Sequence, residues 1–481
     1  MSKSFYLTTT LPYVNSKPHV GFALEIIQAD VIARYHSMQG EDVFFNTGTD
    51  EHGKKIYEKA IEEGKDPQAY TDEYAAKFDA LKSSLNLSYN HFVRTTEPHH
   101  KQAAQELWKR CLANGYIEKG VYTAKYCVGC ELEKTDSDLV DGICPLHPNK
   151  EIELIKEENY FFKFSDSRIQ KALLVHMDTY PDFVVPAHRQ KEIRNFVEGG
   201  LQDFSISRLK EKMPWGVEVP GDPQHVMYVW FDALTNYIST IGWPENEAEF
   251  AKYWGTKESS LAVQIAGKDN LRQQSSMWQA MLFAADLPLT RQILIHGFIT
   301  SGGVKMSKSL GNVIDPLEYS EKYGVDALRY YLLAKVSPFE DSDFTKNKFE
   351  EVYKSDLQNG IGNLVARVAA MAEQLGDKFF NQNPLNSLMN EEVSRSLNEY
   401  NFDEALGSIW GRIKKADVYV STNKVWAMEE NEKIKALTWL IGEIKQVATD
   451  LEPFLPETAK KILEQYGPEK IIKNEALFPR L

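Results

Sequence analysis

The chain has 481 residues, of which 55 are basic and 69 acidic, so its formal net charge is −14. Hydrophobic residues at 43% and aromatic residues at 12% exclude an intrinsically disordered protein, and four cysteines exclude a disulfide scaffold. No apolar run reaches the roughly 18 residues of a membrane span, and the first residues lack the apolar stretch of a secretory signal, so we expect a cytoplasmic protein that does not contact a membrane.

The first elements follow a strand–helix–strand pattern. Residues 5–10 are rich in aromatic and β-branched side chains, which predicts a strand. A helix is expected over 20–39, where apolar residues recur with helical spacing, and Gly40 is its expected stop. The next strand, 43–45, leads into the polar segment 47–53.

A second α/β block and a helical region follow. Strands are expected at 261–266 and 292–295 around a helix at 274–285, and this alternation predicts a doubly wound, mainly parallel sheet of the Rossmann type. From about residue 347 onward, long helical patterns at 357–375, 402–428, 434–451 and 456–466 predict an α-helical bundle. The expected division of the α/β chain is 1–118 and 221–300 for the two halves of the sheet domain, 119–220 for an inserted module, 301–346 for a loop and connecting region, and 347–481 for the bundle.

A tetrapeptide at the start of the first helix is a candidate phosphate site. Pro18-His19-Val20-Gly21 lies at the strand-to-helix turn, where a helix exposes unpaired N–H groups and the positive end of its dipole. His19 adds a donor, and Gly21 lets a flat ligand approach the backbone. Taken alone, the motif favours a histidine that only caps its helix.

A second candidate is the basic loop Lys305-Met306-Ser307-Lys308-Ser309, which follows Ser301-Gly302-Gly303. Lysines and hydroxyls on a glycine-hinged loop can close over a polyphosphate and stabilise a leaving pyrophosphate. Taken alone, the loop can equally be a solvated surface segment. In this order, around two α/β blocks, the two motifs resemble the signatures of class I aminoacyl-tRNA synthetases.

Cysteine and histidine spacing in the insertion predicts a metal site. Cys127 and Cys130 form one Cys-x-x-Cys pair, and Cys144 and His147 form a Cys-x-x-His pair further on. Four such ligands fit a closed, tetrahedral, structural Zn²⁺ site. The alternatives are a redox dithiol and an ordinary set of buried cysteines, but a redox dithiol leaves Cys144 and His147 unexplained. Cys111 is expected in the core.

Further segments narrow the resemblance to the methionyl-tRNA synthetase family over essentially the whole chain. They are Thr8–Asn15, Thr47–Gly53, Tyr126–Glu131, Gly200–Arg208, Tyr228–Ala233, Gly362–Arg367 and Pro453–Ala459. The resemblance implies a ligase that activates methionine with Mg·ATP to methionyl-adenylate and pyrophosphate. It then transfers methionine to the 3′ end of initiator and elongator methionine tRNA. It also implies one structural Zn²⁺ per chain and Mg²⁺ with ATP.

The resemblance also implies roles for individual residues. The matched ATP-binding positions are His19, Gly21, His296, Lys305, Ser307 and Lys308, of which His19, Gly21, Lys305 and Lys308 are the expected catalytic groups. The matched methionine-binding positions are Leu11, Tyr13, Asp50, Trp230, Ala233, Tyr237, Gln274 and Trp278. Asp50 can pair with the ammonium, and an aromatic cavity favours a thioether. Plain core packing is the alternative for any one of these aromatics.

Three matched positions in the bundle imply that it reads the tRNA anticodon. Asn363 and Arg367 share one helix face at i and i+4, and Trp426 matches a position that stacks on a base. Without the resemblance, an arginine paired to a carboxylate and a partly buried tryptophan are the simpler interpretations.

The sequence departs from the family pattern in several places. Phe22 stands where a small polar residue or histidine is common, and it cannot donate to a phosphate. Asn270 and Gln274 replace an apolar residue and a histidine, which makes one wall of the pocket more polar. His147 replaces the commoner fourth cysteine. The chain ends at Leu481, where longer members continue into a dimer-forming domain, so a monomer is expected.

Two rival functions remain at this stage. One is a related synthetase such as the cysteine enzyme, in which a zinc ion on the catalytic face reads the substrate thiol. Metal ligands clustered in an insertion favour a structural ion instead. The other is an inert tRNA-binding protein that keeps the fold, which Phe22 and Gln274 make conceivable and which Asp50 and the lysine loop oppose.

Overall fold

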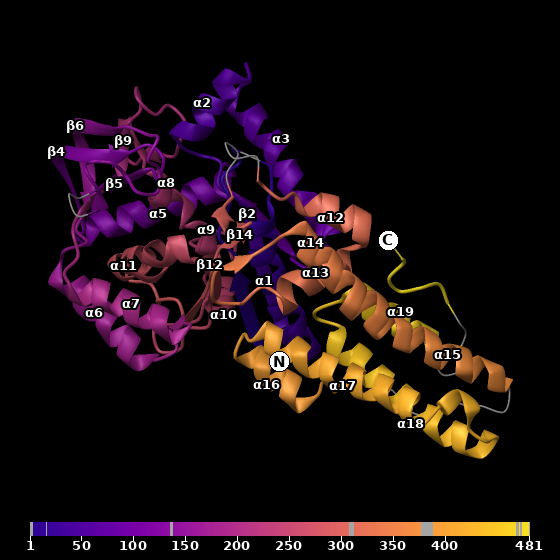
Figure 1. The fold of residues 1–481 in the computed structure, drawn as a ribbon. Helices are drawn as coiled ribbons and strands as arrows, with labels where there is room; N and C mark the ends of the chain where they lie inside the picture. The colour runs from indigo at the N-terminus through magenta and orange to yellow at the C-terminus, as the bar shows by residue number, and fades with distance from the viewer. Residues whose placement is uncertain are drawn as a thin grey trace.

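The centre of the molecule is a parallel sheet of short, apolar strands (Figure 1). The computed structural model describes residues 3–15, 17–134, 138–306, 312–376, 388–467, 471 and 474–480. Within these ranges the main sheet has six strands, in the spatial order β3 (His91–Arg94), β2 (Asp42–Thr49), β1 (Ser4–Thr8), β12 (Val263–Gly267), β13 (Gln292–His296) and β7 (Val184–Val185). All their pairings are parallel, which confirms the predicted doubly wound sheet.

Both faces of this sheet are covered, because its strands are apolar on both sides. Phe5 and Leu7 of β1 join a core with α1 (Val20–Met38), whereas Tyr6 between them joins a second core on the opposite face. That second core includes α5 (Pro98–Ala113) and α11 (Trp278–Ala284). Successive residues of β1 therefore face two different cores.

The chain order places a switch point beside β1. The strand after β1 in the sequence pairs on one side of it, and β12 from the second block pairs on the other, with Phe5 opposite Val43 and Leu7 opposite Val263. In an open α/β sheet, ligands bind in the crevice outside the carboxyl ends of the strands at such a point. We call this place, at the carboxyl ends of β1 and its neighbours, the crevice.

The insertion forms its own antiparallel sheet. In spatial order its strands are β5 (Leu132–Lys134), β4 (Ile117–Cys127), β6 (Ile152–Phe162) and β8 (Phe204–Ser205). After β6 the chain returns through α6 (Ser167–Thr179) to the edge of the main sheet, where β7 pairs with β13, and α7 (Ala187–Glu198) follows. A three-stranded sheet of β10 (Glu218–Val219), β11 (Asp222–Met227) and β9 (Ser207–Leu209) completes this region. The predicted range 119–220 thus contributes to both the module and the main sheet.

Short helices connect the strands of the main sheet. They are α2 (Lys54–Glu62), α3 (Pro67–Asp79), α4 (Leu81–Ser84), α8 (Val229–Ala233), α9 (Asn236–Ser239) and α10 (Glu247–Tyr253). The helix expected over 274–285 is divided: a 3-10 turn, Lys268–Asn270, precedes a π-helical turn, Gln273–Met277, and only then α11.

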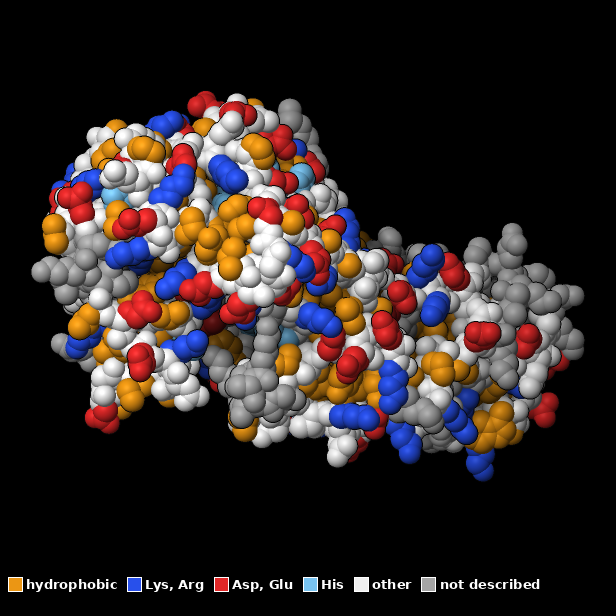
Figure 2. Space-filling view, turned by 90° about the horizontal axis from the view of Figure 1, so that it is seen from above, with side chains coloured by type: hydrophobic (Ala, Val, Ile, Leu, Met, Phe, Trp, Pro, Cys, Tyr) orange, Lys and Arg blue, Asp and Glu red, His pale blue; other side chains and the backbone are white. Residues whose placement is uncertain are grey.

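A helical bundle extends from the α/β body (Figures 1 and 2). A small sheet of β15 (Val304–Lys305), β14 (Ile299–Ser301) and β16 (Ser342–Asp343) and two helices, α12 (Pro316–Tyr323) and α13 (Val325–Ala334), connect the two parts. The bundle comprises α14 (Lys346–Val352), the π-helix Tyr353–Gly362, α15 (Asn363–Leu375), α16 (Glu391–Asn398), α17 (Phe402–Thr422), α18 (Glu430–Leu451) and α19 (Pro456–Gln465). One apolar core runs from α1 into these helices.

The bundle differs from the sequence prediction in detail. The helix expected over 402–428 ends at Thr422, because Lys424 adopts a left-handed conformation with φ of 51° and a 3-10 turn, Val425–Ala427, follows. Helix α16, which the sequence did not suggest, begins at Asn390, whose side chain accepts a hydrogen bond from Glu392 N. None of the described helices is both long and apolar enough to cross a membrane.

Candidate active site and metal centre

Two loops lie next to each other at the carboxyl ends of β1 and β2. Tyr13, in the loop after β1, forms a parallel bridge with Asp50, which follows β2. The backbone N–H of Asp50 donates to Pro12 O at 3.0 Å, and that of Val14 donates to Asp50 O at 3.3 Å. The loop before α1 and the segment 47–53 therefore form one wall of the crevice at the switch point.

The N-terminus of α1 opens onto this crevice. His19 is the N-cap residue, and its Nδ1 accepts a hydrogen bond from Gly21 N at 3.1 Å. The imidazole caps its own helix, which was the simpler of the two interpretations of this motif. Phe22 packs edge-on against Phe78, with ring centroids 5.4 Å apart.

A buried carboxylate joins α1 to β13. Glu25 accepts hydrogen bonds from Thr10 N at 2.8 Å and Thr10 Oγ1 at 2.6 Å, and His296 Nε2 lies 3.0 Å from its other oxygen. Burial acts to lower the pKa of His296, but the bond to Glu25 outweighs it and raises the pKa above its usual value. This contact joins α1, from the first half of the sheet domain, to the end of β13 in the second half.

Asp50 is a buried carboxyl group that follows β2. It is 4% exposed, and burial raises the pKa of its carboxyl well above the usual value. The charges of Asp232 and Glu131 raise that pKa further. Because three carboxyl groups gather with little solvent, the pocket favours a ligand with positive charge.

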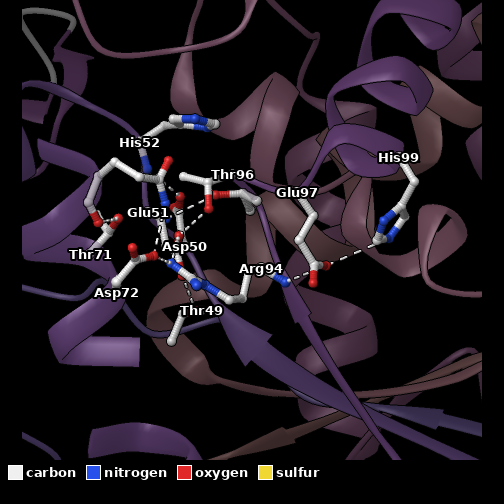
Figure 3. A network of polar contacts seen from close by, with 12 residues as sticks. Thr49, Asp50, Glu51, His52, Thr71, Asp72, Arg94, Thr96, Glu97 and His99 are labelled. Atoms are coloured by element: carbon white, nitrogen blue, oxygen red, sulfur yellow. Dashed lines mark hydrogen bonds and ion pairs between the residues drawn. The ribbon is translucent and has the colours of Figure 1, made fainter. Parts of the chain in front are cut away.

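A polar network behind Asp50 fixes the direction of its segment (Figure 3). The fully buried carboxylate of Glu51 accepts from Arg94 Nε at 2.6 Å and Nη2 at 2.9 Å, and also from Thr49 Oγ1 and Thr96 Oγ1. Because Glu51 is held on this side by several charge-assisted bonds, Asp50 next to it is kept facing the crevice.

Asp232 ties α8 to the same segment. It is fully buried, His52 Nδ1 lies 2.6 Å from one of its oxygens, and His100 Nε2 lies 2.9 Å from the other. Burial acts to raise the pKa of Asp232, but the two imidazoles outweigh it and hold the pKa below its usual value. This clamp fastens α8, which also carries Trp230 and Ala233, to the segment that carries Asp50.

The remaining pocket residues meet through Tyr237. Gln274 Nε2 donates to Tyr237 Oη at 2.7 Å, and the ring of Tyr237 meets that of Trp278 edge-on at 5.8 Å. Gln274 lies in the π-helical turn and is 1% exposed, so its amide is buried beside Tyr237. The indole N–H groups of Trp230 and Trp278 are buried and have no hydrogen-bond partner among the described residues.

The basic loop is described only in part. Lys305 is the last residue of β15 and pairs with Thr300 across a hairpin whose turn residues, Gly302 and Gly303, have φ of 63° and 75°. The side chain of Lys305, together with Ser307 and Lys308, lies outside the described residues. Leu11 is partly buried in the loop after β1.

The predicted metal ligands converge. The ligand atoms of Cys127, Cys130, Cys144 and His147 all lie within 4.8 Å of one another. Cys130 Sγ is 3.5 Å from Cys144 Sγ and 3.2 Å from His147 Nδ1. Tetrahedral Zn²⁺, with bonds of about 2.0–2.3 Å, requires separations of this order. The ring of His147 fills the space of a Gly129 side chain, because a Cβ there would lie 2.2 Å from it. The cluster can hold a metal such as zinc.

The three candidate tRNA-reading residues lie in one region of the bundle. Asn363 is exposed at the first position of α15. Arg367 donates to Asp417 Oδ1 at 2.9 Å, and its guanidinium lies 5.9 Å from the ring centroid of Trp426. Trp426 is 51% exposed, which leaves a large part of its ring open to a partner.

Sequence reasoning missed several residues of this site. Glu25 carried a signal, because it is the only charge between Gly21 and Gln28 on a helix that is otherwise apolar there. Glu131, Asp232 and His100 carried none, because their partners are more than 100 residues distant in the sequence.

Comparison with known proteins shows that the chain is similar to members of one family. The family described as tRNA synthetases class I (M) matches residues 5–152 and 138–369. A methionine–tRNA ligase of Thermosynechococcus vestitus is 40% identical over 487 residues, which cover 97% of this chain and 90% of the relative. A methionine–tRNA ligase of Fusobacterium nucleatum is 38% identical over 495 residues, covering 98% of this chain and 76% of the relative.

Solved structures agree with the sequence matches. The Mycobacterium tuberculosis methionyl-tRNA synthetase in complex with methionyl-adenylate has a TM-score of 0.89 and 33% identity, and the match covers 99% of this chain and 100% of that one. The free-state structure of the M. tuberculosis enzyme has a TM-score of 0.83 and 30% identity.

Proposed function

The chain belongs to the class I methionyl-tRNA synthetase family and is a methionine–tRNA ligase, and we propose that its crevice joins methionine to AMP before transfer to tRNA. A carboxylate oxygen of methionine attacks the α-phosphorus of ATP. The bond from that phosphorus to the bridging oxygen of the β-phosphate breaks, and pyrophosphate leaves. The terminal adenosine of methionine tRNA, initiator or elongator, then receives the methionyl group and AMP is released.

The joined walls of the crevice carry this proposal. The bridge between Tyr13 and Asp50 connects the buried carboxylate of Asp50 to the loop that leads into α1. An ammonium group on Asp50 then lies on one side of the switch point, and a phosphate at the N-terminus of α1 lies on the other. The reacting carboxylate and α-phosphorus would meet between them, so the protein acts chiefly by positioning.

The methionine side chain is proposed to enter the aromatic pocket. Trp230, Tyr237 and Trp278 offer the ring edges and faces that attract a polarisable sulfur. Leu11, Tyr13 and Ala233 supply further apolar surface. Gln274, already bonded to Tyr237, adds a polar group to this wall and does not need the ligand to satisfy it.

ATP is proposed to lie along the start of α1. His19 and Gly21 would hold the phosphate end, and His296, whose charged form Glu25 favours, would attract phosphate charge at the end of β13. Lys305, Ser307 and Lys308 would close over the β- and γ-phosphates, with Mg²⁺ accompanying the nucleotide. The positive charges of the two lysines would stabilise the negative charge on the leaving pyrophosphate.

The metal cluster and the bundle have supporting roles in this proposal. Cys127, Cys130, Cys144 and His147 would hold one structural Zn²⁺, which supplies folding free energy to the inserted module when bound. In the bundle, Asn363 and Arg367 would hydrogen-bond anticodon bases, and Trp426 would stack on one of them. A cytosolic location, a monomeric state and the boundaries of the five chain regions stay predictions.

The decisive test is amino-acid-dependent exchange of labelled pyrophosphate into ATP. The proposal predicts exchange with methionine and a loss of about 100-fold or more in His19→Ala. His99→Ala is the matched control, because His99 is an exposed histidine whose ion-pair partner is Glu97, and its loss should leave exchange unchanged. Exchange with leucine or cysteine in place of methionine would contradict the proposal. So would tRNA binding without adenylate formation, which would establish the inert rival.

A further inference from the structure

A buried glutamate connects the metal cluster to the amino-acid pocket. Glu131 follows the ligand Cys130 directly, has φ of 50° and is 4% exposed. Its carboxylate points out of the cluster, and Tyr13 Oη donates to its Oε2 at 2.9 Å. A left-handed conformation is uncommon for a glutamate, and here it turns the side chain toward the crevice.

Lys55 forms a second link between the same two regions. It lies in the first turn of α2, just after the segment that carries Asp50. Its Nζ donates to Gly129 O at 2.7 Å, between the ligands Cys127 and Cys130, and lies 3.6 Å from Glu131 Oε1. The backbone of the Cys-x-x-Cys turn is therefore fastened to the wall of the crevice at two points.

These links end at the ammonium site. Tyr13 and Asp50 are bridged through their backbones, so a change in the position of Tyr13 is transmitted to the loop that frames Asp50. The path runs from the Cys-x-x-Cys turn through Glu131 to Tyr13 and then to Asp50, with each step a direct contact.

We propose that Glu131 is a positioning residue that fixes Tyr13 in the methionine pocket, so that methionine affinity depends on the metal-bound fold of the Cys-x-x-Cys turn. The proposal rests on the proposed function, because it assigns Tyr13 and Asp50 to the amino acid. It does not involve the nucleotide side of the crevice, to which His19 and His296 are assigned. The structure of the turn thus acts on one substrate and not on the other.

Two substitutions separate positioning from folding. Glu131→Ala removes the acceptor for Tyr13 and is expected to raise the methionine KM in pyrophosphate exchange by about 10- to 100-fold, the usual range for groups that orient a binding residue. The KM for ATP and the zinc content should stay unchanged. Glu131→Gln keeps an oxygen that can accept from Tyr13 and should restore most of the methionine affinity. Glu58→Ala, which removes an exposed glutamate of α2, is the matched control and should match the unaltered chain.

A cycle with Tyr13→Phe keeps the test independent of the metal turn. Tyr13→Phe should weaken methionine binding, measured by calorimetry without ATP, and combining it with Glu131→Ala should add less than a further twofold. Additive losses would overturn the proposal, because they would mean that the two residues act separately.

Metal removal completes the experiment. Chelation of the unaltered chain should weaken methionine binding in calorimetry at least tenfold and leave ATP binding within twofold. Equal loss of both ligands, or unchanged methionine binding in Glu131→Ala, would overturn the proposal. If the unaltered chain with its zinc in place bound no methionine and gave no exchange, the proposed function itself would fail, which is a distinguishable result.

Discussion

A buried arginine gives a sharp test of how the bundle is attached to the α/β body. Arg329 of α13 is fully buried, and its Nη2 lies 2.7 Å from Asp30 Oδ2 on α1. Its Nε donates to Phe454 O at 2.7 Å and its Nη2 to Pro453 O at 3.1 Å, both in the connection between α18 and α19. One side chain therefore joins the helix that begins at His19 to the end of the bundle.

The change Arg329→Met keeps most of the volume and removes every donor. Breaking a buried ion pair by loss of one partner costs about 3–5 kcal/mol. Asp30 keeps the Arg34 Nε contact at 2.7 Å and two bonds from Ser88 at 2.6 Å, so we expect the lower end, about 3 kcal/mol.

The loss should depend on pH. Burial acts to raise the pKa of Asp30, but Arg329 and Arg34 outweigh it and hold the pKa below its usual value. A carboxyl whose pKa is lowered by folding contributes stability above its unfolded pKa, about 3.9, and loses it as pH falls through the folded pKa. The difference between Arg329→Met and the unaltered chain should therefore be full at pH 7 and shrink below about pH 4.

Urea unfolding at pH 7 and below about pH 4 measures this difference in the free energy of unfolding. The control Arg168→Met removes an exposed arginine that pairs with Asp166 and lies over the ring of Tyr116, and it should cost no more than about 1 kcal/mol. A loss below 1 kcal/mol for Arg329→Met at pH 7, or an equal loss at both pH values, would refute the reasoning. If the arginine also fixes the bundle, Arg329→Met should lower aminoacylation more than pyrophosphate exchange.

Three further substitutions probe the site and its supports. Asp50→Asn should abolish methionine binding in calorimetry. It should also raise the free energy of unfolding by about 0.5–2 kcal/mol at pH 7, because folding raises the pKa of Asp50 and its charged form is costly in the folded protein. This gain should vanish below the unfolded pKa, and a loss of stability at pH 7 would contradict the account. Cys127→Ser should lower zinc content, measured by atomic emission, and destabilise the inserted module; unchanged zinc would refute the ligand set. Trp426→Ala should weaken aminoacylation about tenfold or more and leave pyrophosphate exchange unchanged. The control Trp439→Ala removes another exposed tryptophan of the bundle and should change neither activity. Equal loss of both activities in Trp426→Ala would mean that Trp426 has a structural role.

The sequence predicted those features that depend on local spacing. The two closely spaced pairs of Cys127, Cys130, Cys144 and His147 identified a metal cluster, and the structure confirms that these side chains meet. The strand–helix alternation similarly predicted the parallel sheet, because each strand–helix–strand unit consists of contiguous residues. The roles of the individual site residues stay predictions.

Features that depend on distant partners could not be read in this way. Glu131 looks like an ordinary surface charge in the sequence, and only the fold brings it to Tyr13, 118 residues earlier. Arg329 likewise looks like one charge in a helical pattern, and its partners lie on α1 and in the bundle. The π-helical turn around Gln274 was missed because an added residue in a helical turn leaves the apolar spacing almost unchanged.

A crystal structure with methionyl-adenylate bound tests the central claim most directly. The account predicts the ammonium on Asp50, the sulfur among Trp230, Tyr237 and Trp278, and the adenylate phosphate near the N–H groups that begin α1. An adenylate bound elsewhere, or an ammonium group distant from Asp50, would contradict it.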